Sequence, residues 1–333
     1  MLRLAMSTRS ETFDRIRGPL RERGIDVVHL RATERTLRLT ADGDRPADPV
    51  DPAPEEVDVG FVYPTRLMEG GALDARLSIP WVNGRGAVVT SRNKAAVTSA
   101  LDAAGLPVPR TVMVSNPVAE SEVLASLEDA GLSFPVVIKP NSTTRGTGVA
   151  KASDVDDLAG TIDHLNLVHD YRATGDKSYL IQEFLPGSRD YRVMVLDGEC
   201  VGAVERRIPD GEGDPRSGDG GGGESGGGNG DEGEDGNGNG GRNRGRGGGD
   251  RWKHNVHRGA VATAVDLPER HRELAERAAR ELDIDYLGVD LLETDDRLVV
   301  VETNARPTVD AGKYEVDFYD RLAGLIRDTA RRS

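Results

Sequence analysis

The sequence predicts an α/β protein, in which a small open α/β domain precedes a larger unit of paired strands and helices. Short apolar strands alternate with amphipathic helices through the first 88 residues, which is typical of an open α/β domain. Later strand pairs are joined by tight polar turns, which favours hairpins. About half of the 41 glycines lie between Asp210 and Asp250, a stretch with no aliphatic or aromatic side chain. Such a stretch cannot bury enough apolar surface to offset its ordering entropy, so we expect a disordered insert.

The first domain is expected to end near residue 88. Ser10 can begin a helix that runs to about Arg23, because Gly24 then stops it. A weakly alternating run over residues 35–40 ends in Ala-Asp-Gly-Asp, which indicates a hairpin turn ahead of a loop rich in proline and aspartate. Four apolar runs predict strands: Leu2 to Met6, Asp26 to Leu30, Val57 to Tyr63 and Ile79 to Val82.

The second unit begins with a helix that Thr90 or Ser91 can cap and that ends at Ala104, before Gly105. Asp-Gly joins two later strands and is a strong hairpin signal. Three more helices are expected over residues 119–130, 268–282 and 316–331. The predicted strands are Val112 to Val114, Val136 to Lys139, Tyr179 to Phe184, Tyr191 to Leu196, Glu199 to Arg206, Gly288 to Leu292 and Leu298 to Glu302.

Composition excludes several classes of protein. Acidic residues number 57 against 43 basic ones, a net charge of −14, which argues against duplex nucleic acid as a partner. No apolar run approaches the ~18 residues that span a bilayer, and the N-terminus lacks an export signal, so we expect a cytoplasmic protein without membrane contact. The single cysteine, Cys200, excludes an intramolecular disulfide. Many acids with few lysines indicate either a halophile or a GC-rich genome.

The first candidate functional motif is a strand that ends in a lysine and is followed by a glycine-containing loop. Val136-Val-Ile-Lys139 is followed by Pro-Asn-Ser-Thr-Thr-Arg-Gly-Thr-Gly, which ends at Gly148. Backbone N–H groups of such a loop can close around phosphate oxygens while the lysine supplies positive charge. The lysine precedes the glycines, so this is not a Walker loop. Taken alone, the segment could equally be a surface turn.

Two carboxylates and an amide gather on a predicted hairpin. Asp290 and Glu302 lie on strands that a turn can place side by side, and Asn304 projects to the same face as Glu302. Oxygen ligands of this kind suit magnesium shared with substrate phosphates. The alternative is that these carboxylates pair with arginines.

A strand that breaks into a turn, Gln182-Glu-Phe-Leu185, precedes Asp190 and Arg192. Such a hinge can offer backbone N–H and C=O groups to a purine edge and a carboxylate to ribose hydroxyls. An ordinary strand end with surface charges is the alternative.

From about Ser91 onward the chain resembles an ATP-grasp ligase, and the order of its segments is most similar to the RimK-type glutamate ligases. The N-terminal unit is similar to the small domain that precedes the grasp in these enzymes. The resemblance implies a pre-ATP-grasp domain over residues 1–88, a nucleotide-binding subdomain over 89–185 and a catalytic subdomain over 186–333, with the insert at 210–250. It rests on Arg92-Asn-Lys94, Val-Ile-Lys139 with its loop, Gln-Glu-Phe-Leu185, Asp190-Tyr-Arg192, Glu205-Arg-Arg207, Asn255-Val-His-Arg-Gly259, and Asp290 with Glu302-Thr-Asn304.

The resemblance also implies a role for each matching residue. Lys94 and Lys139 are expected on the α- and β-phosphates of ATP, beneath a flexible loop from Ser142 to Gly148. His257 is either a general base or a packed histidine. The other implied site residues are Gly146 in the loop, Glu183, Phe184 and Leu185 at the adenine hinge, Asp190 at the ribose, Asp290, Glu302 and Asn304 as ligands of magnesium or manganese, and Arg192, Arg206, Asn255 and Arg258 beside the reacting phosphate or carboxylate.

The chain departs from the family pattern in two places. Asn304 is followed by Ala-Arg-Pro instead of Ala-Ser-Pro, so Arg306 either meets an acidic substrate or pairs with a local carboxylate. The insert occupies a loop that is short in the family and lies near the acceptor site. A solvated linker is a better interpretation of it than an RNA-binding tail, because its acidic residues outnumber its arginines.

The function implied is an ATP- and magnesium-dependent ligase that activates a carboxylate as an acyl phosphate and joins it to an amino-acid amine, with glutamate expected. Its partners would be ATP, a carboxylate acceptor, an amino acid and further copies of the chain. Two alternatives stay open: a catalytically silent nucleotide-binding protein, and a ligase that uses another amino acid or a carrier-bound substrate.

Overall fold

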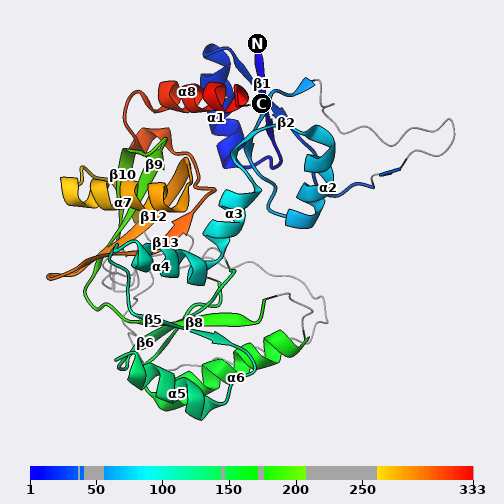
Figure 1. Ribbon diagram of the computed structural model, residues 1–333. Coiled ribbons are helices and arrows are strands. Elements are labelled where there is room, and N and C mark those ends of the chain that lie inside the picture. The colour runs from blue at the N-terminus through cyan, green and yellow to red at the C-terminus, as the bar shows by residue number, and fades with distance from the viewer. Residues whose placement is uncertain (37, 41–55, 144–146, 172–175, 208–260, 333) are drawn as a thin grey trace, which may run out of the picture.

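The computed structural model describes residues 1–36, 38–40, 56–143, 147–171, 176–207 and 261–332. The predicted glycine-rich insert, Gly146, Asn255, His257 and Arg258 lie outside the described residues. The described part is an α/β protein with three sheets. In Figure 1 a parallel sheet lies at the top, and two antiparallel sheets face each other below it.

The first sheet is parallel and has the strand order β2-β1-β3-β4. Its helix α1 (Glu11–Glu22) follows Ser10 as predicted, and Gly24 beyond it has a φ of 77°, which glycine adopts without cost. The described residues of the weakly alternating 35–40 run form no strand, and the hairpin turn predicted after it lies outside the described residues. The strands are β1 (Leu2–Met6), β2 (Ile25–His29), β3 (Val59–Val62) and β4 (Trp81–Asn83).

Helix α2 (Leu67–Leu77) was not expected from the sequence, because Gly70 and Gly71 weaken its helical signal. The structure explains one of these glycines. A Cβ at Gly70 would lie 2.9 Å from the ring of Tyr63, so the absence of a side chain lets the helix pack closely on the end of β3.

The C-terminal helix α8 (Phe318–Ala330) returns to the first sheet and lies beside α1 (Figure 1). Phe318, Leu322 and Ile326 share a core with the strands of that sheet. The same core includes Met194 and Tyr286 from the central sheet. The two ends of the chain therefore meet in one layer, and this layer is joined to the central sheet by apolar packing.

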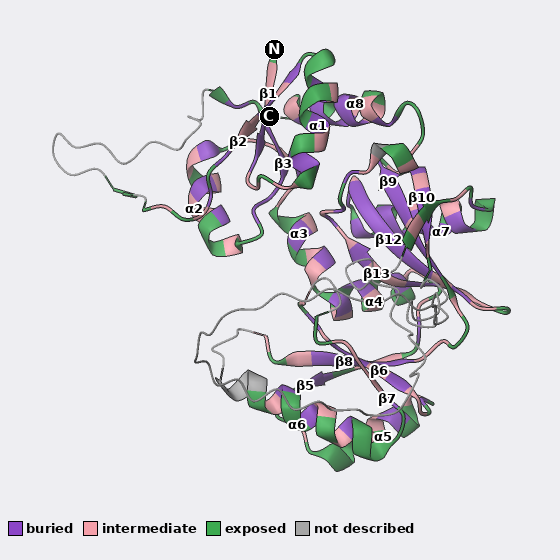
Figure 2. Ribbon diagram, turned by 180° about the vertical axis from the view of Figure 1, so that it is seen from behind, coloured by how far each residue is buried: buried purple, intermediate pink, exposed green. Residues whose placement is uncertain are grey.

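The central sheet is antiparallel and has the order β11-β10-β9-β12-β13. Both predicted hairpins are confirmed, and Asp197 and Gly198 in the first turn have positive φ values of 52° and 77°, as an Asp-Gly turn requires. Helix α7 (Glu269–Leu282) covers one face of buried strands (Figure 2). The strands are β9 (Arg189–Leu196), β10 (Glu199–Arg207), β11 (Val261–Ala264), β12 (Tyr286–Glu293) and β13 (Leu298–Asn304).

The third sheet, with the order β5-β8-β6-β7, carries two helices on its outer face (Figure 1). Helix α5 (Glu120–Asp129) was predicted, whereas α6 (Val155–Tyr171) and β7 were not. Asp154 accepts a hydrogen bond of 2.9 Å from the backbone N of Asp157, a capping signal for α6 that the sequence does contain. The strands are β5 (Thr111–Ser115), β6 (Val136–Pro140), β7 (Ala150–Ala152) and β8 (Ser178–Glu183).

The single helix predicted from residue 90 or 91 to Ala104 is in fact two helices, α3 (Arg85–Arg92) and α4 (Lys94–Ala103). Asn93 separates them, because its ψ of 91° is extended and its side chain caps α4 by accepting from Ala96 N. Lys94 is consequently the first residue of a new helix and not an interior residue of a long one.

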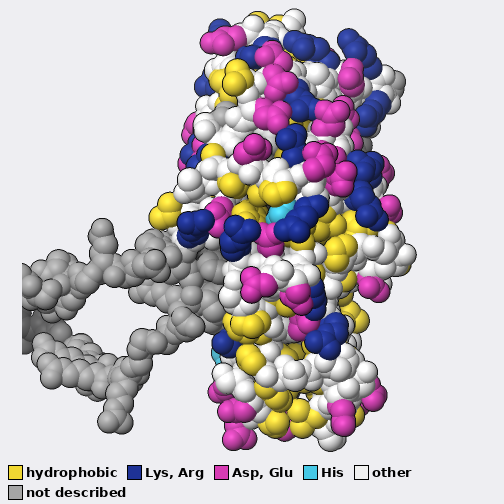
Figure 3. Space-filling view, turned by 90° about the vertical axis from the view of Figure 1, so that its left-hand side faces the viewer, with side chains coloured by type: hydrophobic (Ala, Val, Ile, Leu, Met, Phe, Trp, Pro, Cys, Tyr) yellow, Lys and Arg dark blue, Asp and Glu magenta, His cyan; other side chains and the backbone are white. Residues whose placement is uncertain are grey.

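The surface mixes both signs of charge. Acidic and basic side chains are interspersed over the face shown in Figure 3. In the described part of the chain, every helix is too short or too polar to cross a lipid bilayer.

Candidate functional site

One face of the central sheet changes from apolar to charged along β9. Leu196 and Met194 are buried in the core shared with the first sheet, whereas Arg192 and Asp190 follow on the same face as charged residues. Asp290 lies directly opposite Arg192 on the neighbouring strand β12. Strand alternation therefore presents a charged surface beside the junction with the first sheet.

The predicted pairing of Asp290 with Glu302 is confirmed, because the two residues are opposite each other across β12 and β13. Asn304 lies opposite Gly288 in the same ladder and on the same face as Glu302. The side chains of Asp290, Glu302 and Asn304 therefore lie on one face of the sheet, at the edge formed by β13.

Four charged side chains neutralise one another next to this edge. Arg192 donates to both oxygens of Asp290, at 2.7 and 2.8 Å, and Arg206 donates to Asp190 from Nε at 3.0 Å. Arg206 also lies 3.1 Å from Asp290. Both carboxylates are buried, so neither could stay ionised without these arginines.

The two carboxylates respond differently to this environment. Burial raises the pKa of Asp190, and the nearby charge of Asp290 adds to this effect beyond what Arg206 offsets. Burial also acts to raise the pKa of Asp290, but Arg192 and Arg206 outweigh it and hold that pKa below its usual value. Asp290 is therefore the firmly ionised member of the pair.

Lys94 and Lys139 converge on Glu302 from two other elements. Lys94 Nζ is 3.4 Å from Glu302 Oε1 and also donates to the carbonyl of Thr143. Lys139, at the end of β6, donates to Gln182 Oε1 at 2.8 Å and to the carbonyl of Val301 at 3.3 Å. Burial lowers the pKa of Lys139 to about 8, against the opposing attraction of Glu302.

The donor set suits a hard metal ion in its chemistry. Within the described residues, no cluster of three or more acidic, histidine or cysteine side chains forms a ready metal site. Metal binding would depend on Asp290 and Glu302 completed by the amide oxygen of Asn304 and by ligand oxygens. Asn304 Oδ1 accepts from the backbone N of Arg306 at 2.8 Å, and both Asp290 oxygens face arginine. Magnesium would therefore have to replace an arginine at Asp290.

The described ends of the glycine loop are tied together. Thr143 Oγ1 donates to the carbonyl of Thr147 at 2.9 Å, and Ser142 is exposed beside it. Gly148 has a φ of 77°, and a Cβ there would lie 2.8 Å from Pro140. Gly148 thus lets the chain turn back against the end of β6.

The segment predicted to hold adenine lies where the chain leaves β8. Glu183 is buried and accepts from Arg110 on one side and from Arg297 at 2.5 Å on the other. Lys151 lies over the ring of Phe184 at 4.1 Å. Leu185 accepts from the Ser188 hydroxyl at 3.0 Å.

Sequence reasoning missed the partners of Glu183. Arg297 belongs to the turn between β12 and β13, so its pairing with Glu183 links the central sheet to the third sheet. Arg110 precedes β5, and its backbone N also donates to Glu183 at 2.9 Å. The sequence does show Arg297 directly after Asp295 and Asp296 in a turn. Nothing near Arg297 in the sequence, however, indicates a partner more than a hundred residues away.

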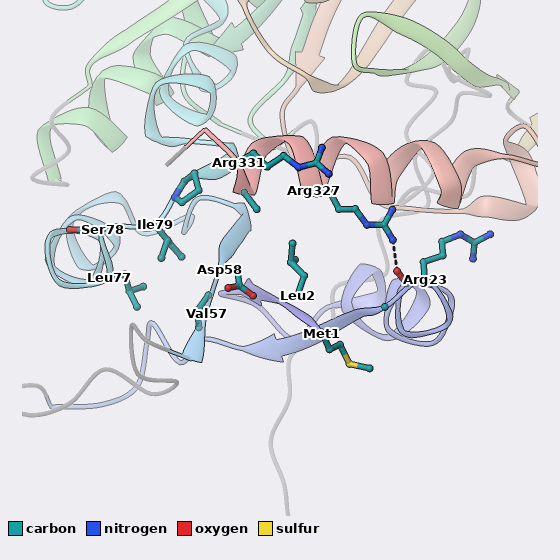
Figure 4. A pocket seen from close by; sticks show the side chains of 13 residues that line it. Met1, Leu2, Arg23, Val57, Asp58, Leu77, Ser78, Ile79, Arg327 and Arg331 are labelled. Atoms are coloured by element: carbon teal, nitrogen blue, oxygen red, sulfur yellow. Dashed lines mark hydrogen bonds between the residues drawn. The ribbon is translucent and has the colours of Figure 1, made fainter.

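A pocket of about 830 Å³ lies elsewhere, between the start of β1, the segment before β4 and the end of α8 (Figure 4). Its lining includes Arg23, Asp58, Ile79 and Arg327. None of the predicted site residues lines it, so it is separate from the charged face of the central sheet.

The two opposed antiparallel sheets, with lysines and carboxylates between them and a small parallel sheet before them, define an ATP-grasp fold. The chain belongs to the RimK-like ATP-grasp family, whose model matches residues 91–225 and 239–323.

Relatives and a solved structure agree with this assignment. A probable alpha-L-glutamate ligase of Enterobacter sp. (strain 638) is 27% identical over 223 residues, 66% of this chain and 58% of the relative. A ribosomal protein bS6–L-glutamate ligase of Escherichia fergusonii is 26% identical with the same coverage. The match therefore spans less than two thirds of these relatives. The structure of the ATP-grasp ligase PsnB with minimal precursor, Mg and ADP has a TM-score of 0.59 at 16% identity, over 99% of this chain and 97% of that one.

Proposed function

We propose that the protein is an ATP-dependent carboxylate–amine ligase. The observation that carries the proposal is the convergence of Lys94, Lys139 and Glu302, from three separate elements, beside Asp290. Two cations opposite two carboxylates are what a metal-bound polyphosphate requires, since the lysines neutralise phosphate and the carboxylates hold the metal.

Each residue has a role in this proposal. Lys94 and Lys139 bind the α- and β-phosphates, and the loop from Ser142 through Gly146 to Gly148 covers the terminal phosphates. Arg192 and Arg206 stabilise the transferring phosphoryl group and the reacting carboxylate, as do Asn255 and Arg258 outside the described residues. The backbone from Glu183 to Leu185 receives adenine, and Asp190 receives the ribose.

Magnesium or manganese would be held by Asp290, Glu302 and Asn304. PsnB, which has the same fold, has been solved with Mg and ADP. When bound, the metal would neutralise phosphate charge. A metal held at Asp290 would replace Arg192 there, which would free Arg192 to meet the transferring phosphate.

The reaction proceeds in two steps. A carboxylate oxygen attacks the γ-phosphorus of ATP, the bond to the β-phosphate oxygen breaks, and ADP leaves with an acyl phosphate formed. An amine nitrogen then attacks the acyl carbon, inorganic phosphate departs and the nitrogen loses a proton, which gives an amide. This chain contributes position, charge neutralisation and exclusion of water, and no covalent nucleophile is required.

Glutamate is the amino acid we propose, because the relatives are named as glutamate ligases. The acceptor would be a protein C-terminus, a coenzyme carboxylate or a carrier-bound amino acid. We also propose that the protein acts in the cytoplasm, that its acidic composition reflects a halophilic source and that it self-associates, as RimK-type enzymes commonly do.

The decisive experiment incubates the protein with ATP, magnesium, labelled glutamate and a metabolite and peptide extract, and follows ADP release together with label transfer by mass spectrometry. ADP release that requires both a carboxylate and an amine would support the proposal. Lys139→Ala and Glu302→Ala should lose ATP binding and turnover, whereas Asp295→Ala in the exposed turn between β12 and β13 should retain both. The proposal fails if no carboxylate gives ADP and the first two variants bind ATP normally.

A silent nucleotide-binding protein is the second candidate. It predicts that ATP binds to the wild type and that Lys139→Ala weakens it, without ADP release from any substrate panel. The retention of both lysines together with Asp290, Glu302 and Asn304 favours the enzyme, because a protein that only binds nucleotide has no need of a complete set of groups for phosphoryl transfer.

A further inference from the structure

Arg306 carries a half-buried positive charge that no carboxylate of the described residues neutralises. Its Nη2 donates to Thr8 Oγ1 at 3.2 Å, whereas its Nη1 is inaccessible to solvent and has no hydrogen-bond partner among the described residues. No aspartate or glutamate of the described chain lies within 4.0 Å of its guanidinium. The local ion pair that the sequence allowed is therefore absent from the described part of the structure.

The surroundings of Arg306 add charge of the same sign. Arg92, at the end of α3, repels it, and burial and this repulsion both lower the pKa of Arg306. Ser7, beside Thr8 in the segment after β1, has a buried hydroxyl that also lacks a partner in the described chain. The guanidinium of Arg92 itself donates to the carbonyl of Thr65 at 2.7 Å. The described surroundings of Arg306 therefore supply a second cation and an unpartnered hydroxyl, but no carboxylate in contact with its guanidinium.

This group lies next to the proposed reaction site. Arg306 is two residues beyond Asn304, and its backbone N donates to Asn304 Oδ1 at 2.8 Å. Ser7 and Thr8 come from the other side, at the end of β1 in the first sheet. The cluster of Ser7, Thr8, Arg92 and Arg306, which we call the junction cluster, thus joins the first sheet to the charged edge of the central sheet.

A half-buried guanidinium with one inaccessible, unpartnered nitrogen is costly, and the cost is recovered when an anion binds to it. We propose that the junction cluster binds a carboxylate of an acidic substrate, one that is not itself phosphorylated. The planar guanidinium offers paired N–H groups that match the two oxygens of a carboxylate, and the Ser7 hydroxyl can donate to the same group. This inference rests on the proposed function for the identity of the substrate, but not for the presence of the site.

The position of the cluster separates it from nucleotide binding. Lys94 and Lys139 serve the proposed phosphate site from α4 and β6. The guanidinium groups of Arg306 and Arg92 instead donate to Thr8 and to the carbonyl of Thr65, which follow strands of the first sheet. Loss of Arg306 should therefore weaken the binding of an acidic substrate and leave the binding of ATP unchanged. A neutral analogue of that substrate should bind with the same affinity to the wild type and to a variant that lacks Arg306.

The test begins with binding alone, so that it does not depend on turnover. Sodium glutarate, a simple dicarboxylate, is titrated into the full-length protein at constant ionic strength, and Kd is obtained from the shift in melting temperature. We expect glutarate to bind the wild type and Arg17→Gln, an exposed arginine on α1, equally well. Arg306→Gln should bind at least tenfold more weakly, with partial recovery in Arg306→Lys. Equal responses in all four proteins would overturn the proposal, and so would a preference for sulfate over glutarate.

Arg92→Gln distinguishes a binding site from a merely structural arginine. The substitution removes both the repulsion of Arg306 and the hydrogen bond from Arg92 to the Thr65 carbonyl, so the melting temperature without ligand should change little. Binding of glutarate should weaken severalfold, because one cation is lost. An unchanged affinity for glutarate in Arg92→Gln would contradict the proposal.

Turnover supplies the second readout once ADP release has been found. Arg306→Gln should raise KM for the acidic substrate at least tenfold, with KM for ATP unchanged and kcat within threefold. An unchanged KM for the acidic substrate would refute the assignment. If no substrate gives ADP while glutarate still distinguishes Arg306→Gln, the proposed function has failed and the anion site stands.

Discussion

Arg192 holds both oxygens of Asp290, at 2.7 and 2.8 Å, while Asp190 depends on Arg206. The two aspartates lie on neighbouring strands and share Arg206, but only Asp290 has a lowered pKa. Burial raises the pKa of Asp190, so this carboxyl group is easier to neutralise. The pair therefore forms one buried unit with unequal members.

This inequality predicts different costs for two matched substitutions. Asp290→Asn leaves two partly buried guanidinium groups, those of Arg192 and Arg206, with one carboxylate, and we expect the free energy of unfolding at pH 7 to fall by about 3 kcal/mol. Asp190→Asn resembles the protonated form that its environment already favours, so it should cost less than half as much. Urea denaturation of both variants checks the order, and an equal or reversed order would contradict it.

Lys139 predicts a dependence of stability on pH. Burial lowers its pKa from 10.5 to about 8. Between these values the unfolded chain keeps a proton that the folded chain has lost, so stability contributed at this site rises as pH increases from 8 to 10.5. The free energy of unfolding of wild type, minus that of Lys139→Met, should grow by at most about 3 kcal/mol over this range. A difference that stays flat or falls would show that Lys139 is not desolvated in the folded protein.

The sequence predicts the charged edge well because short-range rules determine it. The turn pairs Glu293 with Leu298, and a β-bulge between Asp290 and Leu291 shifts the register by one residue, so that Glu302 and not Val301 lies opposite Asp290. Strand alternation then places Asn304 on the same face as Glu302. The position of Lys139 at the end of a strand is predicted by the apolar run that precedes it. These placements need no knowledge of distant segments.

The parts that escaped prediction depend on contacts between distant segments or on weak local signals. The pairing of Glu183 with Arg297 requires two sheets to be brought together, and the return of α8 to the first sheet requires the whole chain. Asn93 is a residue type that often caps helices, but the apolar pattern continues across it, so the sequence predicts one helix where the structure has two. For Arg306 the sequence left two alternatives, a local ion pair or an acidic substrate, because the absence of a carboxylate near its guanidinium depends on how distant segments pack.

Glu183 predicts an acid-sensitive link between the sheets. Burial acts to raise its pKa, but the hydrogen bonds from Arg297 and Arg110 outweigh this and lower it. The stability that the carboxylate contributes is fully present above its ordinary pKa of 4.5 and is lost as pH falls through the lower folded value. Because both arginines are partly exposed, we expect only about 1 kcal/mol from Glu183→Gln at pH 7.

The check for Glu183 is a pair of denaturation series at pH 7 and pH 3. The difference between wild type and Glu183→Gln should shrink at the lower pH, whereas Glu120→Gln on the exposed face of α5 should change little at either pH. If the difference is as large at pH 3 as at pH 7, the carboxylate charge is not what links the sheets.

Gly202 connects the packing of β10 to the proposed reaction site. Its φ is 144°, and a Cβ there would lie 2.8 Å from Tyr314 Cα and 3.0 Å from the Lys313 carbonyl. Neither neighbour is a flexible side-chain end, so the backbone would have to move. Gly202→Ala should therefore lower the free energy of unfolding by about 2–3 kcal/mol.

Gly324→Ala provides the matched control, since a Cβ there meets nothing within 4 Å inside α8. That substitution should raise stability by about 0.5–1 kcal/mol, because alanine loses less backbone entropy in a helix. Tyr314 lies close enough to Arg192 to interact with it electrostatically, so the shift caused by Gly202→Ala should also reduce ADP formation. If the two alanine variants are equally stable, the close approach at Gly202 is relieved without cost, and the segment around Tyr314 does not constrain the position of Arg192.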